Sequence, residues 1–195
     1  MTDPVPDPLP DPVTDAVPDP DAGTLDPRLR SVTLEIEAHA AESGWDQASR
    51  LFALVRTRDL LAREPGLAEA LGIDSAEEGA LTPVEQDTLP ADRALEDVLD
   101  GIMWPAEVLG CAAVVERLVL PPSADDEMPE DAAAAQQFAA EHPDRQEVRM
   151  VAAVTRDGST YCTLRMRAHD DDASVLEGTD LVPGLLELLH GTLEQ

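Results

Sequence analysis

Residues 147–168 read EVRMVAAVTRDGSTYCTLRMRA, and this stretch decides the fold. Two runs rich in apolar and β-branched residues flank Asp157-Gly158, a pair that is typical of two-residue type I′ turns. With these two residues at the turn, Val154 lies opposite Tyr161 and Ala153 lies opposite Cys162. The stretch therefore predicts an antiparallel β-hairpin.

Alternation along the two strands divides the predicted hairpin into two faces. One face carries Val151, Ala153, Cys162, Leu164 and Met166. The other face carries Val154, Tyr161, Thr163, Arg165 and Arg167. The first face is the better core because it is apolar throughout. The second face is partly polar, so we expect it to face solvent or to form a binding surface.

Helical spacing and turn residues predict the other elements. Asp26 and Pro27 indicate the start of a helix, and Gly44 indicates its end. Residues 50–56 (RLFALVR) and residues 108–120 are typical of strands. Further helices are expected over 57–71 with an interruption at Pro65, over 95–99, over 130–142 and after a cap at Asp180. An acidic loop with one capped turn, Thr82–Glu85, is expected over 73–92.

This order of elements predicts an α+β fold. We expect an antiparallel sheet of about four strands covered by helices on one face, with the N- and C-terminal helices packing on it. Residues 27–195 form this single domain in the prediction. Residues 1–26 repeat Asp and Pro, beginning with Asp3-Pro4-Val5-Pro6. Because proline lacks an N–H donor and favours extended backbone, this segment is expected to be a disordered arm.

The charge of the chain restricts its partners. It has 41 Asp and Glu residues against 13 Lys and Arg, a formal net charge of −28, and none of the basic residues is lysine. A polyanion repels phosphates and anionic bilayers, so we expect neither nucleic acid nor a membrane as a partner. The lack of lysine excludes P-loop and Schiff-base chemistry.

Two cysteines and the N-terminal sequence predict where the protein resides. Cys111 and Cys162 lie in apolar stretches, which is typical of buried thiols in a reducing compartment. The N-terminus does not resemble a secretory signal, and no apolar run is long enough to span a bilayer. We therefore expect a cytoplasmic protein, and no motif predicts a cofactor.

The negative charge is unevenly distributed. Residues 1–27 and residues 122–144 each carry seven acids and no arginine. Residues 145–169 are the positive exception, with five arginines against Glu147 and Asp157. The acids therefore concentrate in the arm and the connections, whereas the near-neutral segments are expected to form the core.

A run of metal-ligating residue types follows the hairpin. His169, Asp170, Asp171 and Asp172 offer an imidazole and three carboxylates, which are ligands for Mg²⁺, Mn²⁺ or Zn²⁺. Neighbouring side chains on an extended segment point in opposite directions, so a site would need further ligands, such as Glu147 or Asp144. The alternative is an acidic turn that Arg165 and Arg167 partly neutralise.

The arginines of the hairpin allow two interpretations. Arg149, Arg165 and Arg167, with Tyr161 beside them, could form a docking site for an acidic peptide or a phosphate group. Alternatively, the arginines form ion pairs with the acidic connections of the same chain. The sequence alone leaves both interpretations open.

Several segments resemble an uncharacterised actinobacterial protein family over about residues 28–195. They are residues 34–39 (LEIEAH), 44–47 (GWDQ), 50–55 (RLFALV), 104–105 (WP), 110–112 (GCA), 116–117 (ER) and 169–172 (HDDD). The order of elements, in addition, resembles the type III secretion chaperone-like fold. The resemblance implies a source and a fold but no catalytic residues.

The sequence therefore favours a non-catalytic cytosolic interaction protein, an adaptor or chaperone-like module. Its expected partner is another protein or a second copy of the chain, since a homodimer through the outer sheet face or an edge strand fits the predicted fold. The alternative is a metal-dependent hydrolase that uses the His169–Asp172 run.

Overall fold

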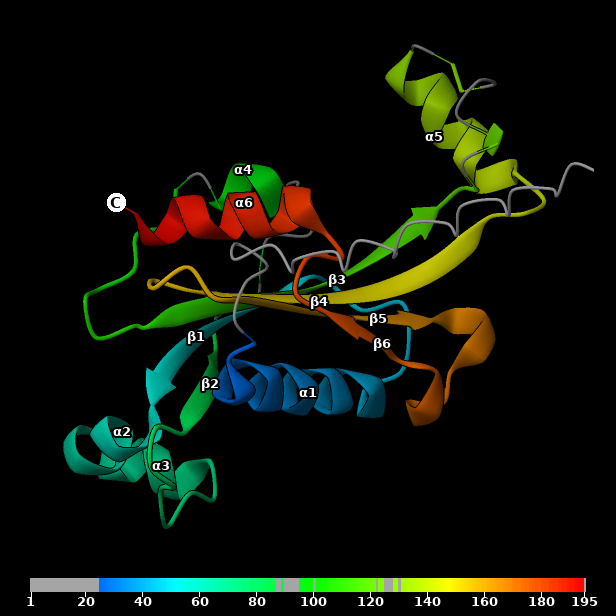
Figure 1. Ribbon diagram of the computed structural model, residues 1–195. Coiled ribbons are helices and arrows are strands. Elements are labelled where there is room, and N and C mark those ends of the chain that lie inside the picture. Colours follow the sequence, from blue (N-terminus) through cyan, green and yellow to red (C-terminus); the bar gives the residue numbers. More distant parts are fainter. Residues whose placement is uncertain are drawn as a thin grey trace, which may run out of the picture.

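The computed structural model describes residues 25–86, 89, 95–99, 101–121, 123–124, 128–129 and 131–194. Residues 1–24 of the predicted arm lie outside the described residues. Six strands form one antiparallel sheet in the order β2-β1-β3-β4-β5-β6 (Figure 1). The strands are β1 (Arg50–Arg56), β2 (Leu81–Glu85), β3 (Gly110–Val119), β4 (Gln146–Thr155), β5 (Thr160–Met166) and β6 (Leu176–Gly178). The α-helices are α1 (Pro27–Glu42), α2 (Thr57–Arg63), α3 (Pro65–Ala70), α4 (Leu95–Leu99), α5 (Ala132–Glu141) and α6 (Pro183–Leu193). The predicted α+β class is confirmed.

Helix α1 begins where the sequence predicts. The Asp26 carboxylate accepts a hydrogen bond from the Arg28 backbone N–H at 2.9 Å, and Pro27 occupies the first turn. Leu29, Val32 and Ile36 recur at helical spacing, and all three are buried against one face of the sheet. On that face they pack against residues of β1, β3, β4 and β5.

Helices α4 and α6 cover the opposite face of the sheet (Figure 1). Leu186, Leu189 and Leu193 of α6 are buried there, together with Leu95 and Leu99 of α4. The expectation that all helices lie on one face is therefore wrong, because the N- and C-terminal helices sandwich the sheet. Helix α6 begins at Pro183 after Val182, so Asp180 is not its cap.

The predicted register of the hairpin is wrong by one residue. Val154 pairs with Thr160, and Ala153 pairs with Tyr161. The loop contains three residues, Arg156 to Gly158, because the Thr155 backbone N–H donates to the Ser159 carbonyl at 3.0 Å. Gly158 has a φ of 88°, the left-handed conformation that a three-residue hairpin loop requires at its last position.

This one-residue shift exchanges the faces of β5. Cys162 now shares a face with Ala152 and Val154 under α6. Tyr161 and Thr163 instead lie under α1, where both are buried. The predicted outward face of the hairpin is therefore part of the interior.

The sheet has two more strands than the sequence predicts. Thr82–Glu85, predicted as a capped turn, belongs to β2, which pairs with β1 through Leu54 and Pro83 among others. Because β2 is an edge strand, the backbone nitrogen of Pro83, which has no hydrogen to donate, can point away from β1 without removing a hydrogen bond from the sheet. The short strand β6 forms the other edge, where Thr163 pairs with Glu177.

Candidate functional site

Arg165, the centre of the predicted docking surface, is buried under α1. Its side chain is 3% exposed, and its Nε and Nη2 lie 2.6 and 2.9 Å from the two carboxylate oxygens of Glu37 in α1. Nη2 also lies 2.8 Å from Asp172 Oδ1, and Nη1 lies 3.4 Å from Asp170 Oδ1. Hydrogen bonding to Glu37 raises the pKa of Arg165 above its usual value. Arg165 therefore already holds its acidic partners within the chain.

Arg149 is the cross-strand neighbour of Arg165 and is equally enclosed. Its side chain is 1% exposed, and its Nη2 lies 2.8 Å from Glu116 Oε1 and donates to the Gly44 carbonyl. Nη1 has no hydrogen-bond partner among the residues that the structure describes. Two guanidinium groups at opposite positions repel each other, and the separate carboxylates of Glu116 and Glu37 compensate this repulsion.

Trp45 joins Arg149 to Arg167. The centroid of its indole ring lies 4.5 Å from Arg149 Cζ and 5.6 Å from Arg167 Cζ, so the ring contacts both cations. Arg167 also binds the two carboxylate oxygens of Asp46 at 2.9 Å each and pairs with Glu147. This bidentate bond lowers the pKa of the Asp46 carboxyl group, and the Asp46 backbone N–H, at a φ of 65°, donates to Glu116 Oε2 at 2.8 Å. The cluster thereby fastens the loop between α1 and β1.

Tyr161 belongs to a second polar contact at the edge of α1. Its hydroxyl accepts a hydrogen bond from Arg30 Nε at 3.1 Å and donates one to Glu177 Oε2 at 2.7 Å. Burial and the bond to Glu177 raise the pKa of Tyr161. The ring is buried among apolar residues, so only the hydroxyl reaches the polar rim.

The structure does not gather His169, Asp170, Asp171 and Asp172 into a ligand set. Two short 3₁₀ turns, Arg167–His169 and Asp172–Ser174, separate their side chains. Asp170 accepts hydrogen bonds from Trp45 and Arg165, Asp172 from Arg165, and Asp171 from the Ser174 hydroxyl. Within the described part of the chain, no three His, Cys, Asp or Glu side chains are arranged to hold a metal ion.

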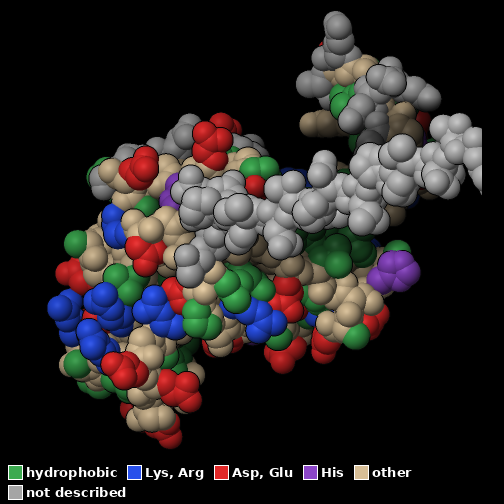
Figure 2. Space-filling model, viewed as in Figure 1, with side chains coloured by type: hydrophobic (Ala, Val, Ile, Leu, Met, Phe, Trp, Pro, Cys, Tyr) green, Lys and Arg blue, Asp and Glu red, His purple; other side chains and the backbone are tan. Residues whose placement is uncertain are grey.

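Exposed arginines lie in and beside helix α2, whereas the sequence indicates an arginine surface on the hairpin of β4 and β5. The side chains of Arg56, Arg58 and Arg63 are 46, 70 and 64% exposed, and their ion pairs are long, at 3.5–3.9 Å. In the space-filling view, blue side chains gather at the left of the molecule, toward α2 (Figure 2). The arginines of the hairpin, Arg149, Arg165 and Arg167, instead pair with acids of the same chain, and two of them, Arg149 and Arg165, are buried.

An apolar cleft lies beside β1 and β2 on the face of the sheet that α6 also covers. Its volume is about 630 Å³, within the usual range for ligand sites. The cleft is lined by strands β1 and β2, by helices α2 and α3, and by residues 101–108. Its lining includes Leu60, Val84 and Met103. Met103 is 70% exposed and stands at its rim.

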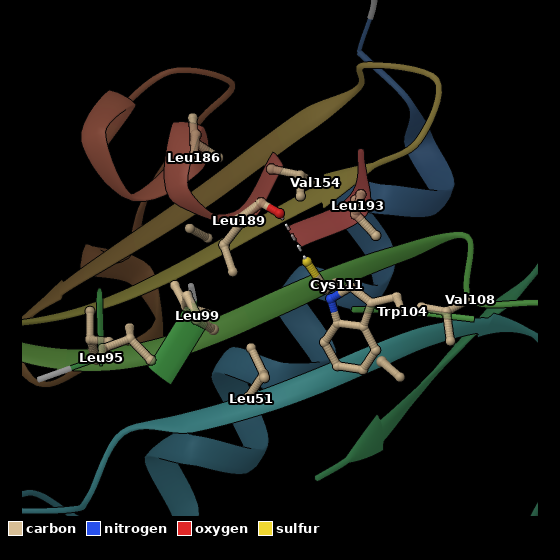
Figure 3. Packing of buried hydrophobic residues seen from close by; sticks show 14 of the residues in the cluster. Leu51, Leu95, Leu99, Trp104, Val108, Cys111, Val154, Leu186, Leu189 and Leu193 are labelled. Carbon is tan, nitrogen blue, oxygen red and sulfur yellow. Dashed lines mark hydrogen bonds between the residues drawn. The ribbon is translucent and has the colours of Figure 1, made fainter. Parts of the chain in front are cut away.

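The described lining of the cleft offers apolar contact but no acid or base. Among its described lining residues, Gln86 carries the one side-chain amide, and none has a titratable side chain. Trp104 forms part of the wall, and its Nε1 donates to the Thr192 hydroxyl of α6 at 2.9 Å. Figure 3 shows Trp104 beside Cys111, whose thiol points to the Leu189 carbonyl at 3.7 Å. The wall is therefore part of the hydrophobic core.

Both cysteines are buried as predicted, and neither forms a disulfide. Burial raises the pKa of Cys111 to about 11 and also raises that of Cys162. Each thiol is therefore protonated at neutral pH and inert as a nucleophile.

Sequence reasoning missed the cleft because it treated residues 73–92 as a loop. Val84 lines the cleft only because β2 adds a strand beyond β1. The alternation of Leu81, Pro83 and Glu85 with Thr82 and Val84 was a weak strand signal that Pro83 obscured. No local pattern indicated that residues 101–108 would form the opposite wall.

The fold and the paired side chains define an α+β protein with an internal arginine network and an apolar cleft. Residues 29–194 match the family model described as PPA1309-like protein, and the chain belongs to this family. The match agrees with the predicted membership of an uncharacterised family over about residues 28–195. Comparison with curated proteins and with solved structures gave no match. Among the described helices, none is long and apolar enough to cross a membrane.

Proposed function

We propose that this protein is a non-catalytic interaction module of the cytoplasm, an adaptor or chaperone-like protein that binds an apolar segment of another protein. The apolar cleft carries the proposal. It provides room and apolar surface for a bound side chain, and its described lining contains no group that can donate or remove a proton. We also propose that the protein has the type III secretion chaperone-like topology and an actinobacterial origin.

The charged candidates support the same interpretation. Arg149 and Arg165 are nearly inaccessible, and internal carboxylates already occupy both guanidinium groups. A binding function is therefore better placed at the cleft, where Met103 is exposed and Ile102 is partly buried against the core.

A neutral fluorescent apolar dye such as Nile red tests the cleft, because an anionic dye would be repelled by the chain. Met103→Asp adds a charge at the rim of the cleft without changing a buried residue. Its matched control is Leu176→Asp at the opposite edge of the sheet, where the side chain is 56% exposed. We expect the dye to bind the natural chain and the control about equally and Met103→Asp at least about fivefold more weakly.

The proposal fails if the natural chain does not bind the dye, or if the two variants weaken binding equally. Dye binding alone does not identify a protein partner. A protein captured from the native cytosol must therefore also bind the purified chain and lose affinity with Met103→Asp but not with Leu176→Asp.

A further inference from the structure

The two longest strands extend beyond the rest of the sheet and carry α5 at their end (Figure 1). Strands β3 and β4 pair as far as Val119 and Gln146. Strand β1 pairs with β3 only as far as Val114, and β5 pairs with β4 only as far as Val148. The end of this ribbon therefore has no neighbouring strand on either side among the described residues. The described residues between 117 and 147 form the β3–β4 extension.

Helix α5 receives little support from the described part of its own chain. Asp131 caps it by accepting a hydrogen bond from the Ala134 N–H at 2.9 Å, yet none of its described side chains is buried. Phe138 is half-buried and meets the His142 ring edge-on, with the two ring centroids 5.4 Å apart. A helix of this length is marginal in water without tertiary contacts, so a partner would stabilise it.

Large apolar side chains are exposed on the same extension. Leu118, Val119 and Met128 are 43, 38 and 42% exposed. Because consecutive strand residues point to opposite faces, Leu118 and Val119 leave apolar surface on both sides of the ribbon. Exposed apolar surface at the end of a projecting element is typical of a contact with another molecule.

The charge of the extension selects among the classes of partner. Residues 117–147 contain eight acids and two arginines, Arg117 and Arg145, so their net charge is strongly negative. A second copy in a twofold interface would bring these acids against the same acids, and nucleic acids and anionic bilayers are repelled for the same reason. A segment that is both apolar and cationic is complementary to this surface, because it covers the apolar side chains and neutralises the acids.

We infer that the β3–β4 extension docks a cationic amphipathic helix of another protein. The apolar side of that helix covers Leu118 or Val119 and the ribbon, and its lysines or arginines face the described acids of the extension. Glu141 and Asp144 are exposed members of that acidic set. This docking surface is distinct from the apolar cleft and does not depend on it.

Synthetic 18-residue helical peptides test the inference on the full-length chain. One peptide combines leucine with lysine, and its counterpart combines leucine with glutamate. Binding is measured by fluorescence anisotropy in about 50 mM and about 500 mM salt. We expect the lysine peptide to bind, to lose at least about tenfold in affinity at high salt, and to gain helix content on binding. The glutamate peptide should not bind.

Matched variants locate the binding. Leu118→Ser with Val119→Ser removes apolar contact, whereas Glu141→Gln with Asp144→Asn removes negative charge. Each double variant should bind the lysine peptide at least about fivefold more weakly than the natural chain does. The controls are Leu176→Ser, an exposed leucine of β6, and Glu69→Gln with Glu187→Gln, which changes the charge equally at distant exposed positions. The controls should stay within about twofold.

Three outcomes would overturn the inference. The first is equal weakening by the extension variants and the control variants, which would show diffuse attraction to a polyanion. The second is binding that does not weaken with salt. The third is a concentration-dependent dimer in sedimentation velocity that Leu118→Ser with Val119→Ser dissociates, which would make a second copy the occupant. Because none of these variants lines the cleft, each outcome leaves the test with Met103→Asp independent.

Discussion

Replacing Arg165 with methionine should destabilise the protein strongly, because it leaves Glu37 as an unpaired charge in the interior. The side chains of Arg165 and Glu37 are 3 and 5% exposed, and two hydrogen bonds of 2.6 and 2.9 Å join them. Removing one partner of such a buried pair costs about 3–5 kcal/mol in the free energy of unfolding. For a domain of this size, that corresponds to a fall in Tm of about 6–20 °C.

The same reasoning predicts that a second substitution restores the loss. Glu37→Leu in the Arg165→Met background removes the stranded carboxylate and fills the site with apolar volume. Replacing a whole buried ion pair by well-packed apolar residues is often neutral or stabilising by about 1–4 kcal/mol. The double variant should therefore be within about 1 kcal/mol of the natural protein.

Urea denaturation followed by circular dichroism gives the free energies for the double-mutant cycle. Arg167→Met is the matched control, because this side chain is 39% exposed and its partners Asp46 and Glu147 are 75 and 40% exposed. It should cost about 1 kcal/mol or less. The reasoning is refuted if Arg165→Met costs no more than Arg167→Met, or if the double variant is as unstable as Arg165→Met alone.

Three further predictions concern the core and the acidic turn. Gly110→Ala would press its new Cβ into the Val154 carbonyl oxygen and should lower the free energy of unfolding by about 1–3 kcal/mol. Gly66→Ala in α3 has open space around it and should raise the free energy of unfolding by about 0.5–1 kcal/mol. The midpoints of urea denaturation measure both changes. Burial raises the pKa of Cys111 from 9.0 to about 11, so the unfolded chain loses this proton first. Stability should therefore fall between pH 9 and 11, and Cys111→Ala should show less of that fall in urea midpoints measured across this range. Mg²⁺, Mn²⁺ and Zn²⁺ should leave the Tm unchanged in a thermal-shift assay, because Arg165 holds two carboxylates of the His169–Asp172 run; a saturable upward shift would contradict this.

Helical periodicity predicted most of the helices correctly. Leu29, Val32 and Ile36 identified the buried side of α1, and the leucines of α6 identified the helix on the other face. These patterns are local, because each helix shows its apolar stripe in a short window of sequence. The stripes contain no information about which face of the sheet each helix covers, and the prediction failed on that point.

The edge strands escaped prediction for different physical reasons. Pro83 makes β2 look like a turn, although an edge position tolerates the missing N–H. Strand β6 is only three residues long, so alternation has no length over which to appear. Both strands become evident only when a neighbour pairs with them.

The arginine network could not be predicted because its partners are distant in sequence. Arg165 and Glu37 are 128 residues apart, and Trp45 and Asp170 are 125 residues apart. The sequence showed that arginines and acids were available in complementary segments, which left internal pairing open as one of two interpretations. Choosing between them required knowing that α1 covers this face.

A single loop residue determined which face of the sheet the polar side of β5 occupies. Asp157-Gly158 fits a two-residue turn, but the Thr155 hydroxyl donates to Asp157 Oδ1 at 2.6 Å, and Gly158 alone in this loop adopts a positive φ. The loop thereby gains Arg156, and every side chain of β5 changes face relative to the predicted pairing. The polar side of β5 then faces α1, where Glu37 meets Arg165. Because Arg149 and Arg165 are buried and paired within the chain, the binding roles that we propose lie at the cleft and at the β3–β4 extension.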